Sequence, residues 1–131
     1  MASLGGSGSE VSDLNAVSVL VVEDTWHVAN AMKSALEQLG MQVVGPTATT
    51  AEARRLVAEE HPKVAIVDVN LKREMANHLI DELHEQGVRV VVVSGYAAPP
   101  VSKESVAAFL QKPFSGAELI TTVSAVVRSL H

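Results

Sequence analysis

The sequence predicts an α/β fold, a doubly wound five-stranded parallel sheet of flavodoxin-like (βα)5 topology with strand order 2-1-3-4-5. Short apolar runs rich in β-branched residues, such as VSVLVV, alternate with segments of helical periodicity. Hydrophobic residues make up 47% of the 131 residues and aromatic residues only 3%, so the core must be aliphatic. Strands that alternate with helices favour a parallel sheet covered on both faces, because right-handed crossovers place the helices there.

The first half of the chain contains two strand–helix units after a small, polar segment at residues 1–15, which we interpret as a flexible tail. An apolar, β-branched run predicts a strand at 17–22, and spaced apolar residues predict a helix at 28–39 that ends at Gly40. A second strand is expected at 41–44. Thr49, with Glu52 three residues later, predicts a capped helix that runs to residue 60 before His61-Pro62.

Three further units complete a single domain over residues 16–131. VAIVDV at 64–69 and VRVVVVS at 88–94 predict buried strands, with a helix between them at 74–86 that breaks at Gly87. A loop and a weak, short helix are expected next, because Pro99 and Pro100 precede a polar stretch. The last strand is expected at 107–111 and the last helix, which is amphipathic, at 115–130.

Composition excludes several classes of function. A formal net charge of −5 leaves no basic patch, so we expect no binding to nucleic acid. The chain has no cysteine, hence neither disulfides nor thiolate metal sites. It shows no signal peptide and no apolar run of the roughly 18 residues that a membrane span needs. We therefore expect a soluble protein in the cytoplasm, with no membrane contact.

Three carboxylates follow strands whose carboxyl ends should meet at one edge of the sheet. Glu23 and Asp24 end the first strand and Asp68 ends the third, beside the switch point where such sheets bind ligands. Like charges this close resist ionisation unless a cation joins them. A carboxylate site with retained waters suits Mg²⁺, which we expect as the cofactor.

A hydroxyl and an ammonium reach the same edge. Ser94 ends the fourth strand and Lys112 follows the fifth. A bound cation, an ammonium and a hydroxyl donor together would stabilise the charge of a phosphoryl group. The chemistry that this set predicts is attack by an Asp carboxylate to give an acyl phosphate.

The pattern VLVVED…VAIVDVNL…VVVVSGY…FLQKPF resembles the receiver domain of bacterial response regulators over residues 17–130. The resemblance implies that Asp68 accepts the phosphoryl group and that Asp24 and Asp68 are direct metal ligands. Glu23 would hold the metal mainly through water, and the backbone carbonyl of Asn70 would complete the protein ligands.

The resemblance also implies roles around the phosphoryl group. Ser94 and Lys112 would each contact one phosphoryl oxygen, and Pro113 would occupy the family's cis-proline position. Phe109 would be the aromatic switch residue, unless it is simply a core side chain. Tyr96 would slow the access of hydrolytic water, unless it is a surface residue.

The implied function is a stand-alone response regulator of a two-component phosphorelay. Its donor would be a histidine kinase or a histidine phosphotransfer protein, and its output would go to a downstream protein through the surface of residues 97–106, the fifth strand and the last helix. On that helix Leu119, Ile120, Val123, Val127 and Leu130 are expected in the core. Ala117, Ala125 and Val126 lie off that stripe and would support a homodimer.

Three other functions are alternatives to this interpretation. A flavin-binding module needs phosphate-cradling residues after the first strand, where this chain has EDTWH. An Asp-nucleophile phosphatase would carry its two acids as Asp-x-Asp after the first strand. A receiver-shaped adaptor without phosphorylation stays open, because the loop DVNLKREM lacks the family's Met-Pro and adds Lys72 and Arg73. The five histidines show no metal-ligand spacing and are interpreted as surface residues.

Overall fold

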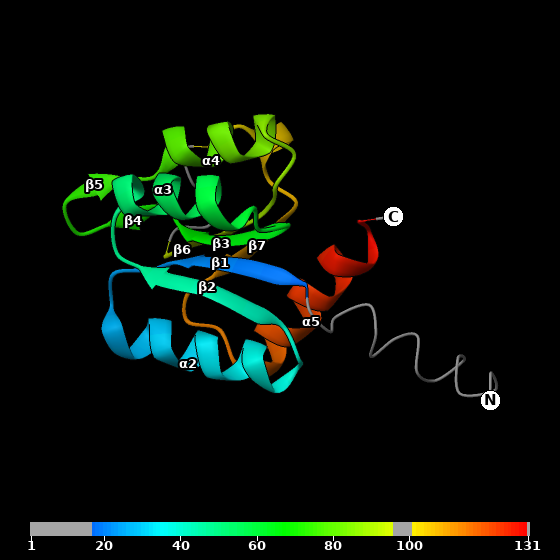
Figure 1. Cartoon of the computed structure of the whole chain (residues 1–131). Helices are drawn as coiled ribbons and strands as arrows, with labels where there is room; N and C mark the ends of the chain where they lie inside the picture. Colours follow the sequence, from blue (N-terminus) through cyan, green and yellow to red (C-terminus); the bar gives the residue numbers. More distant parts are fainter. Residues whose placement is uncertain (1–16, 96–100, 131) are drawn as a thin grey trace.

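The computed structural model describes residues 17–95 and 101–130. Its main sheet has five parallel strands in the order β2-β1-β3-β6-β7, which is the predicted 2-1-3-4-5 order (Figure 1). The strands, in chain order, are β1 (Ser18–Val22), β2 (Gln42–Thr47), β3 (Val64–Asp68), β6 (Arg89–Ser94) and β7 (Ala108–Gln111). The predicted fold class is therefore confirmed.

Helices cover both faces of the sheet (Figure 1). One face carries α2 (Trp26–Gln38) and α5 (Gly116–Arg128), and the other carries α3 (Thr50–Glu60) and α4 (Asn77–Glu85). Alternate residues of each strand point to opposite faces. Val19 and Val21 of β1 thus join one apolar cluster, whereas Leu20 and Val22 join the other. The central strands are apolar on both faces because both faces are covered.

The β2 strand extends beyond the predicted residues 41–44. It runs through Gly45 and Pro46 to Thr47, although both residue types usually interrupt a strand. Proline lacks the N–H that a central strand must donate, but β2 lies at the edge of the sheet, where that donor is not needed. The edge position therefore explains why β2 continues through Gly45 and Pro46, beyond the predicted end at residue 44.

The helix predicted at 74–86 begins later than expected. Glu74–Met75 forms the short strand β5, which pairs antiparallel with β4 (Asn70–Leu71), and α4 starts only at Asn77. The prediction was wrong at this end because Glu74 and Met75 fit a helical pattern equally well. The pairing of β5 with β4 makes residues 74–75 a strand, and the local periodicity of the sequence does not indicate that pairing.

The described part of the connection between β6 and β7 contains less helix than predicted. Among its described residues the only helical element is one 3-10 turn, η2 (Lys103–Ser105), so a fourth α-helix is not seen there. Residues 97–100 of the predicted output surface lie outside the described residues, as do the predicted tail and His131.

Helix ends follow the predicted signals in most cases. Gly40 adopts a positive φ of 88° just after α2, as the cap prediction requires. Thr49 accepts a hydrogen bond from the amide of Glu52, but the Glu52 side chain binds Arg55 instead of closing the capping box. A complete capping box forms instead at α5, between Ser115 and Glu118.

On α5 one core assignment was wrong. Val126 is buried, so the apolar surface expected to support a homodimer is reduced to Ala117 and Ala125, whereas Ile120 and Leu130 are only half-buried. The buried face of α5 is wider than predicted, because α5 packs on both the sheet and α2. None of the helices in the described part of the chain is long and apolar enough to cross a membrane.

Candidate functional site

Three carboxylates converge at the carboxyl edge of the sheet. Glu23 and Asp24 come directly after β1, and Asp68 is the last residue of the neighbouring strand β3. Each side chain offers one oxygen, and these oxygens all lie within 4.8 Å of one another. Glu23 and Asp68 are buried and Asp24 is half-buried. The parallel pairing of β1 with β3 thus assembles the acidic cluster that the strand ends predicted.

Lys112 brings a positive charge to this cluster. Its Nζ lies 2.7 Å from Oδ2 of Asp68 and 3.1 Å from Oε1 of Glu23. Its backbone amide donates to the carbonyl of Ser94 at 2.8 Å, which continues the β6–β7 ladder past the end of β7. Burial lowers the pKa of Lys112, but the hydrogen bonds and charges of Asp68 and Glu23 outweigh it and raise this pKa above its usual value. Lys112 is therefore held as a cation.

Glu23 is the least satisfied of the three acids. Its Oε2 accepts the amide of Thr25 at 3.1 Å, but its buried Oε1 accepts no hydrogen bond of good geometry from the described residues. Burial raises the pKa of Glu23, and the charge of Asp68 adds to that rise, while Thr25 and Lys112 oppose it. A buried carboxylate oxygen that is ion-paired with Lys112 but accepts no well-aligned hydrogen bond, beside two more acids, fits a hard divalent cation, whose preferred ligands are such oxygens.

The segment after β3 closes over the acids with backbone amides. The amide of Asn70 donates to Oδ1 of Asp68 at 3.0 Å, and the amide of Lys72 donates to a carboxylate oxygen of Asp24. Both oxygens of Asp68 are thus engaged, one by Asn70 and one by Lys112. The Lys72 contact could not be predicted from the sequence, because every residue except proline has a backbone amide donor.

The other predicted residues lie close by in the sheet. Ser94 is fully buried at the end of β6, and the Lys112–Pro113 peptide bond is cis. Phe109 pairs with Val92, two residues before Ser94, which puts Phe109 and Ser94 on the same face of the sheet. Phe109 is 36% exposed, so it is not a fully buried core residue. Tyr96 lies outside the described residues.

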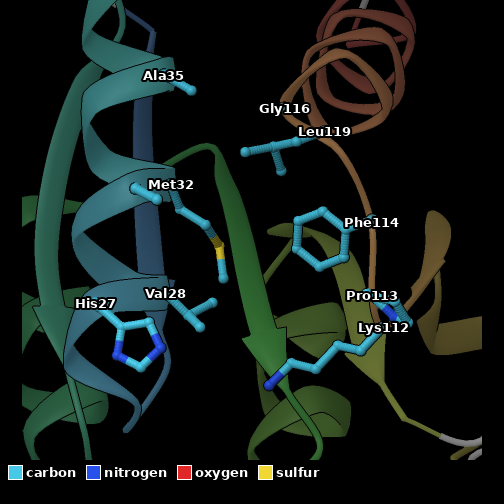
Figure 2. Close-up of a pocket in the computed structure, with 10 residues that line it drawn as sticks. His27, Val28, Met32, Ala35, Lys112, Pro113, Phe114, Gly116 and Leu119 are labelled. Atoms are coloured by element: carbon cyan, nitrogen blue, oxygen red, sulfur yellow. The ribbon is translucent and has the colours of Figure 1, made fainter.

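An apolar pocket of about 350 Å³ lies between α2 and the β7–α5 connection, directly beside the acidic cluster. Figure 2 shows Val28 and Met32 of α2 on one side of it, and Phe114 and Leu119 on the other. Lys112 lines the same pocket and reaches Asp68 with its Nζ. This pocket was not predicted, although an apolar Phe114 directly after Pro113 is a sequence signal that could have indicated it.

A family model matches most of the chain. The model of the response regulator receiver domain matches residues 19–124, which is most of the 131-residue chain. The protein therefore belongs to the response-regulator receiver domain family. Receiver domains are phosphoacceptor switches rather than enzymes in the ordinary sense, and they bind Mg²⁺ at an acidic pocket; this chain has an acidic cluster of Glu23, Asp24 and Asp68. No curated protein sequence matches the chain.

Solved structures show the same fold at low identity. The response regulator PhyR from Brucella abortus is 22% identical with a TM-score of 0.78, and the match covers 96% of this chain and 54% of that one. A CheY-like receiver domain protein from Methanospirillum hungatei JF-1 is 22% identical with a TM-score of 0.80, covering 88% and 97%. Another, from Methylobacillus flagellatus, is 23% identical with a TM-score of 0.72, covering 89% and 100%. The chain thus spans about half of the PhyR structure.

Proposed function

We propose that this protein is a stand-alone response regulator of a two-component phosphorelay that acts in the cytoplasm. In this proposal Asp68 accepts a phosphoryl group from a histidine kinase or a histidine phosphotransfer protein, with Mg²⁺ as cofactor. The observation that carries the proposal is the position of Asp68, a buried carboxylate in contact with Lys112 and clustered with Glu23 and Asp24. Such a set combines a nucleophile with charges that stabilise a phosphoryl group.

The proposed transfer requires few groups. An oxygen of Asp68 forms a bond to phosphorus, the bond from phosphorus to the donor nitrogen breaks, and the donor imidazole keeps the electron pair and takes up a proton. Lys112 Nζ pairs with a phosphoryl oxygen, and the Ser94 hydroxyl donates to another. When bound to Asp24, Asp68, the Asn70 carbonyl and, through water, Glu23, Mg²⁺ would neutralise phosphoryl charge.

The acyl phosphate carries about −1.5 to −2 charges at pH 7, in place of the single negative charge of the Asp68 carboxylate. That change would draw Ser94 and Lys112 towards the new oxygens and bias the packing of β7, where Phe109 lies on the same face as Ser94. We propose that the output surface includes β7, α5 and the connection before β7, whose only helical element among the described residues is η2. A downstream protein would bind there, and the apolar pocket beside Lys112 would contact the donor protein.

The competing hypothesis is an adaptor that binds partners without being phosphorylated. Two contacts distinguish it from the phosphoacceptor hypothesis: the amide of Lys72 donates to Asp24, and the ammonium of Lys112 pairs with Asp68. Exchange of these contacts for Mg²⁺ and phosphate oxygens is required by the phosphoacceptor hypothesis and not by the adaptor hypothesis. The two therefore differ in a directly measurable reaction.

The test is incubation with Mg²⁺ and acetyl phosphate, followed by intact mass. We expect one phosphoryl adduct that requires Mg²⁺ and is absent from Asp68→Asn. Asp81→Asn is the matched control, because Asp81 is a half-buried aspartate of α4 that binds Ser105 and has no part in the cluster. Absence of an adduct in the wild-type protein, with a Mg²⁺-dependent change in Trp26 fluorescence, would favour the adaptor.

A further inference from the structure

A small hairpin, residues 70–75, lies next to the acidic cluster and contacts two of its acids. It consists of β4 and β5, paired as Asn70 with Met75 and Leu71 with Glu74. Its backbone amides at Asn70 and Lys72 donate to Asp68 and Asp24, respectively. The position of this hairpin therefore sets two hydrogen bonds that orient the candidate metal ligands.

Two strands of two residues each cannot hold a hairpin by themselves, since even longer isolated hairpins are marginal in water. At its base, Ala76 donates to the carbonyl of Val69 at 2.8 Å, and Leu71 is buried in the core. The outer strand is held differently, because Met75 is 46% exposed and contributes little to the core. Glu74 must therefore be considered as the anchor of that strand.

Glu74 joins the hairpin to α3 through two hydrogen bonds. Its Oε2 accepts the backbone amide of Thr50 at 2.9 Å, and its Oε1 accepts the Thr50 hydroxyl at 2.7 Å. Thr50 is the first residue of α3, where helix amides lack partners inside the helix and the helix dipole favours an anion. These hydrogen bonds, side-chain first and backbone second, lower the pKa of Glu74, so it accepts both as a carboxylate at neutral pH.

The anchor is itself supported from α4. Arg54 donates to the Thr50 hydroxyl at 3.3 Å and pairs with Glu82 of α4 at 2.7 Å. The chain of contacts from Glu82 through Arg54 and Thr50 to Glu74 thus ties two helices to the hairpin. No residue in this chain of contacts belongs to the acidic cluster, so its contribution to the site must pass through the hairpin backbone.

We propose that Glu74 is a positioning residue for the phosphoacceptor site: by anchoring the hairpin on α3, it keeps the amides of Asn70 and Lys72 on Asp68 and Asp24. This inference rests on the proposed function, because it assigns the orientation of the same metal ligands. Groups that orient metal ligands from behind typically change metal affinity by roughly 10- to 100-fold when removed. Glu74 does not contact a metal ligand itself and acts through the hairpin backbone, so we expect a change in Mg²⁺ affinity at the lower end of this range, about 10-fold.

The test compares Mg²⁺ titrations of wild type, Glu74→Ala and Glu74→Gln, followed by Trp26 fluorescence. We expect Glu74→Ala to bind Mg²⁺ about 10-fold more weakly. Glu74→Gln keeps one acceptor oxygen and loses the other, so its affinity should fall between the two. The phosphorylation rate with acetyl phosphate should recover in both variants at saturating Mg²⁺, because the ligands and Asp68 are unchanged. A general loss of structure would not give weaker Mg²⁺ binding together with a phosphorylation rate that recovers at saturating Mg²⁺.

Two matched variants separate positioning from charge and from folding. Glu52→Ala removes another carboxylate from the first turn of α3 without touching the hairpin, so its Mg²⁺ affinity should equal that of wild type. Thr50→Val removes the hydroxyl, which donates to Glu74 and accepts from Arg54, and so should weaken Mg²⁺ binding as Glu74→Gln does, even if Glu74→Ala fails to fold. Equal weakening in Glu52→Ala, or Mg²⁺ affinity of Glu74→Ala within about twofold of wild type, would overturn the proposal.

Hydrogen exchange at the Lys72 amide separates this proposal from the proposed function, because it needs neither metal nor phosphate. We expect faster exchange in Glu74→Ala and Thr50→Val than in wild type and Glu52→Ala. A wild-type protein that binds no Mg²⁺ would overturn the proposed function while this exchange still reports on the anchor. Unchanged Lys72 exchange in Glu74→Ala would overturn the anchor itself.

Discussion

Lys112 Nζ lies 2.7 Å from Asp68 Oδ2, and the same nitrogen lies 3.1 Å from Glu23 Oε1. One ammonium thus faces two buried carboxylates that come from different strands. In the absence of a metal, Lys112 is the cation that makes their burial tolerable, since a buried charge without a partner is costly. The residue proposed to bind the phosphoryl group therefore also stabilises the resting site.

The first prediction is that Lys112→Met destabilises the metal-free protein. The substitution keeps the apolar stem but leaves Glu23 and Asp68 without their cation. Breaking a buried pair costs about 3–5 kcal/mol, but the Lys112 side chain is 30% exposed and partly screened, so we expect about 1–3 kcal/mol. Urea unfolding in the presence of a chelator measures the difference.

Lys63→Met is the control for this experiment, because Lys63 is exposed and forms no ion pair among the described residues. Mg²⁺ should restore more stability to Lys112→Met than to wild type, because the ion replaces the missing positive charge. Equal stabilisation of the two proteins by Mg²⁺ would mean that Lys112 and the ion do not share the same carboxylates.

Much of the site was predictable because strands position their ends. Short continuous apolar runs rich in β-branched residues identify strands buried on both faces, and parallel pairing brings their carboxyl ends to one edge. Glu23, Asp24, Asp68 and Lys112 therefore could be grouped before any coordinates were known. Their mutual distances confirm that grouping, with the oxygens of the three acids within 4.8 Å and Lys112 in contact with two of them.

The hairpin of residues 70–75 could not be predicted in the same way. Its strands are too short to show a period, and Glu74 also fits the start of a helix. Its contact with Thr50 joins positions 24 residues apart, and the contact of Lys72 with Asp24 uses a backbone amide. Neither interaction depends on a residue pattern that a single sequence displays.

The second prediction concerns Glu23 and pH. Burial, with the charge of Asp68, raises the pKa of Glu23 in the folded protein above the unfolded value of 4.5. Protonated Glu23 therefore favours folding. Its favourable contribution is complete below pH 4.5 and is lost as pH rises through the higher folded pKa. Without Mg²⁺, the stability of wild type relative to Glu23→Gln should fall as pH rises above 4.5, as measured by urea unfolding.

Glu52→Gln provides a control of opposite sign. The hydrogen bond from Arg55 lowers the pKa of Glu52, so any stability that Glu52 contributes is present above pH 4.5 and is lost as pH falls through the lower folded pKa. The pair is exposed, so the effect should be small. A wild-type protein that gains stability relative to Glu23→Gln as pH rises would contradict the assignment of Glu23 as a buried, poorly compensated acid.

The third prediction concerns the capping box of α5. The Ser115 hydroxyl accepts the amide of Glu118 at 3.0 Å, and the Glu118 carboxylate accepts the amide of Ser115 at 2.8 Å. Ser115→Ala should cost about 1 kcal/mol of unfolding free energy, a typical value for loss of an N-cap. Thr49→Ala at α3 is the comparison, because only half of the box is present there. A larger loss at Thr49 would contradict the two-bond assignment at Ser115.

The fourth prediction separates phosphorylation from the response to it. Ser94 is fully buried at the end of β6, on the same sheet face as Phe109 of β7, whereas the proposed nucleophile is Asp68. Ser94→Ala should therefore accept one phosphoryl group from acetyl phosphate, while the phosphorylation-dependent NMR shifts of the Phe109 ring and amide should largely disappear. The reason is that the hydroxyl is the proposed link between a phosphoryl oxygen and β7.

Ser102→Ala is the control, because the exposed Ser102 hydroxyl binds Glu104 away from the acidic cluster and should leave those shifts unchanged. Full Phe109 shifts in phosphorylated Ser94→Ala would show that β7 senses the phosphoryl group by another route, with Lys112 as the next candidate because it follows β7 directly and already contacts Asp68.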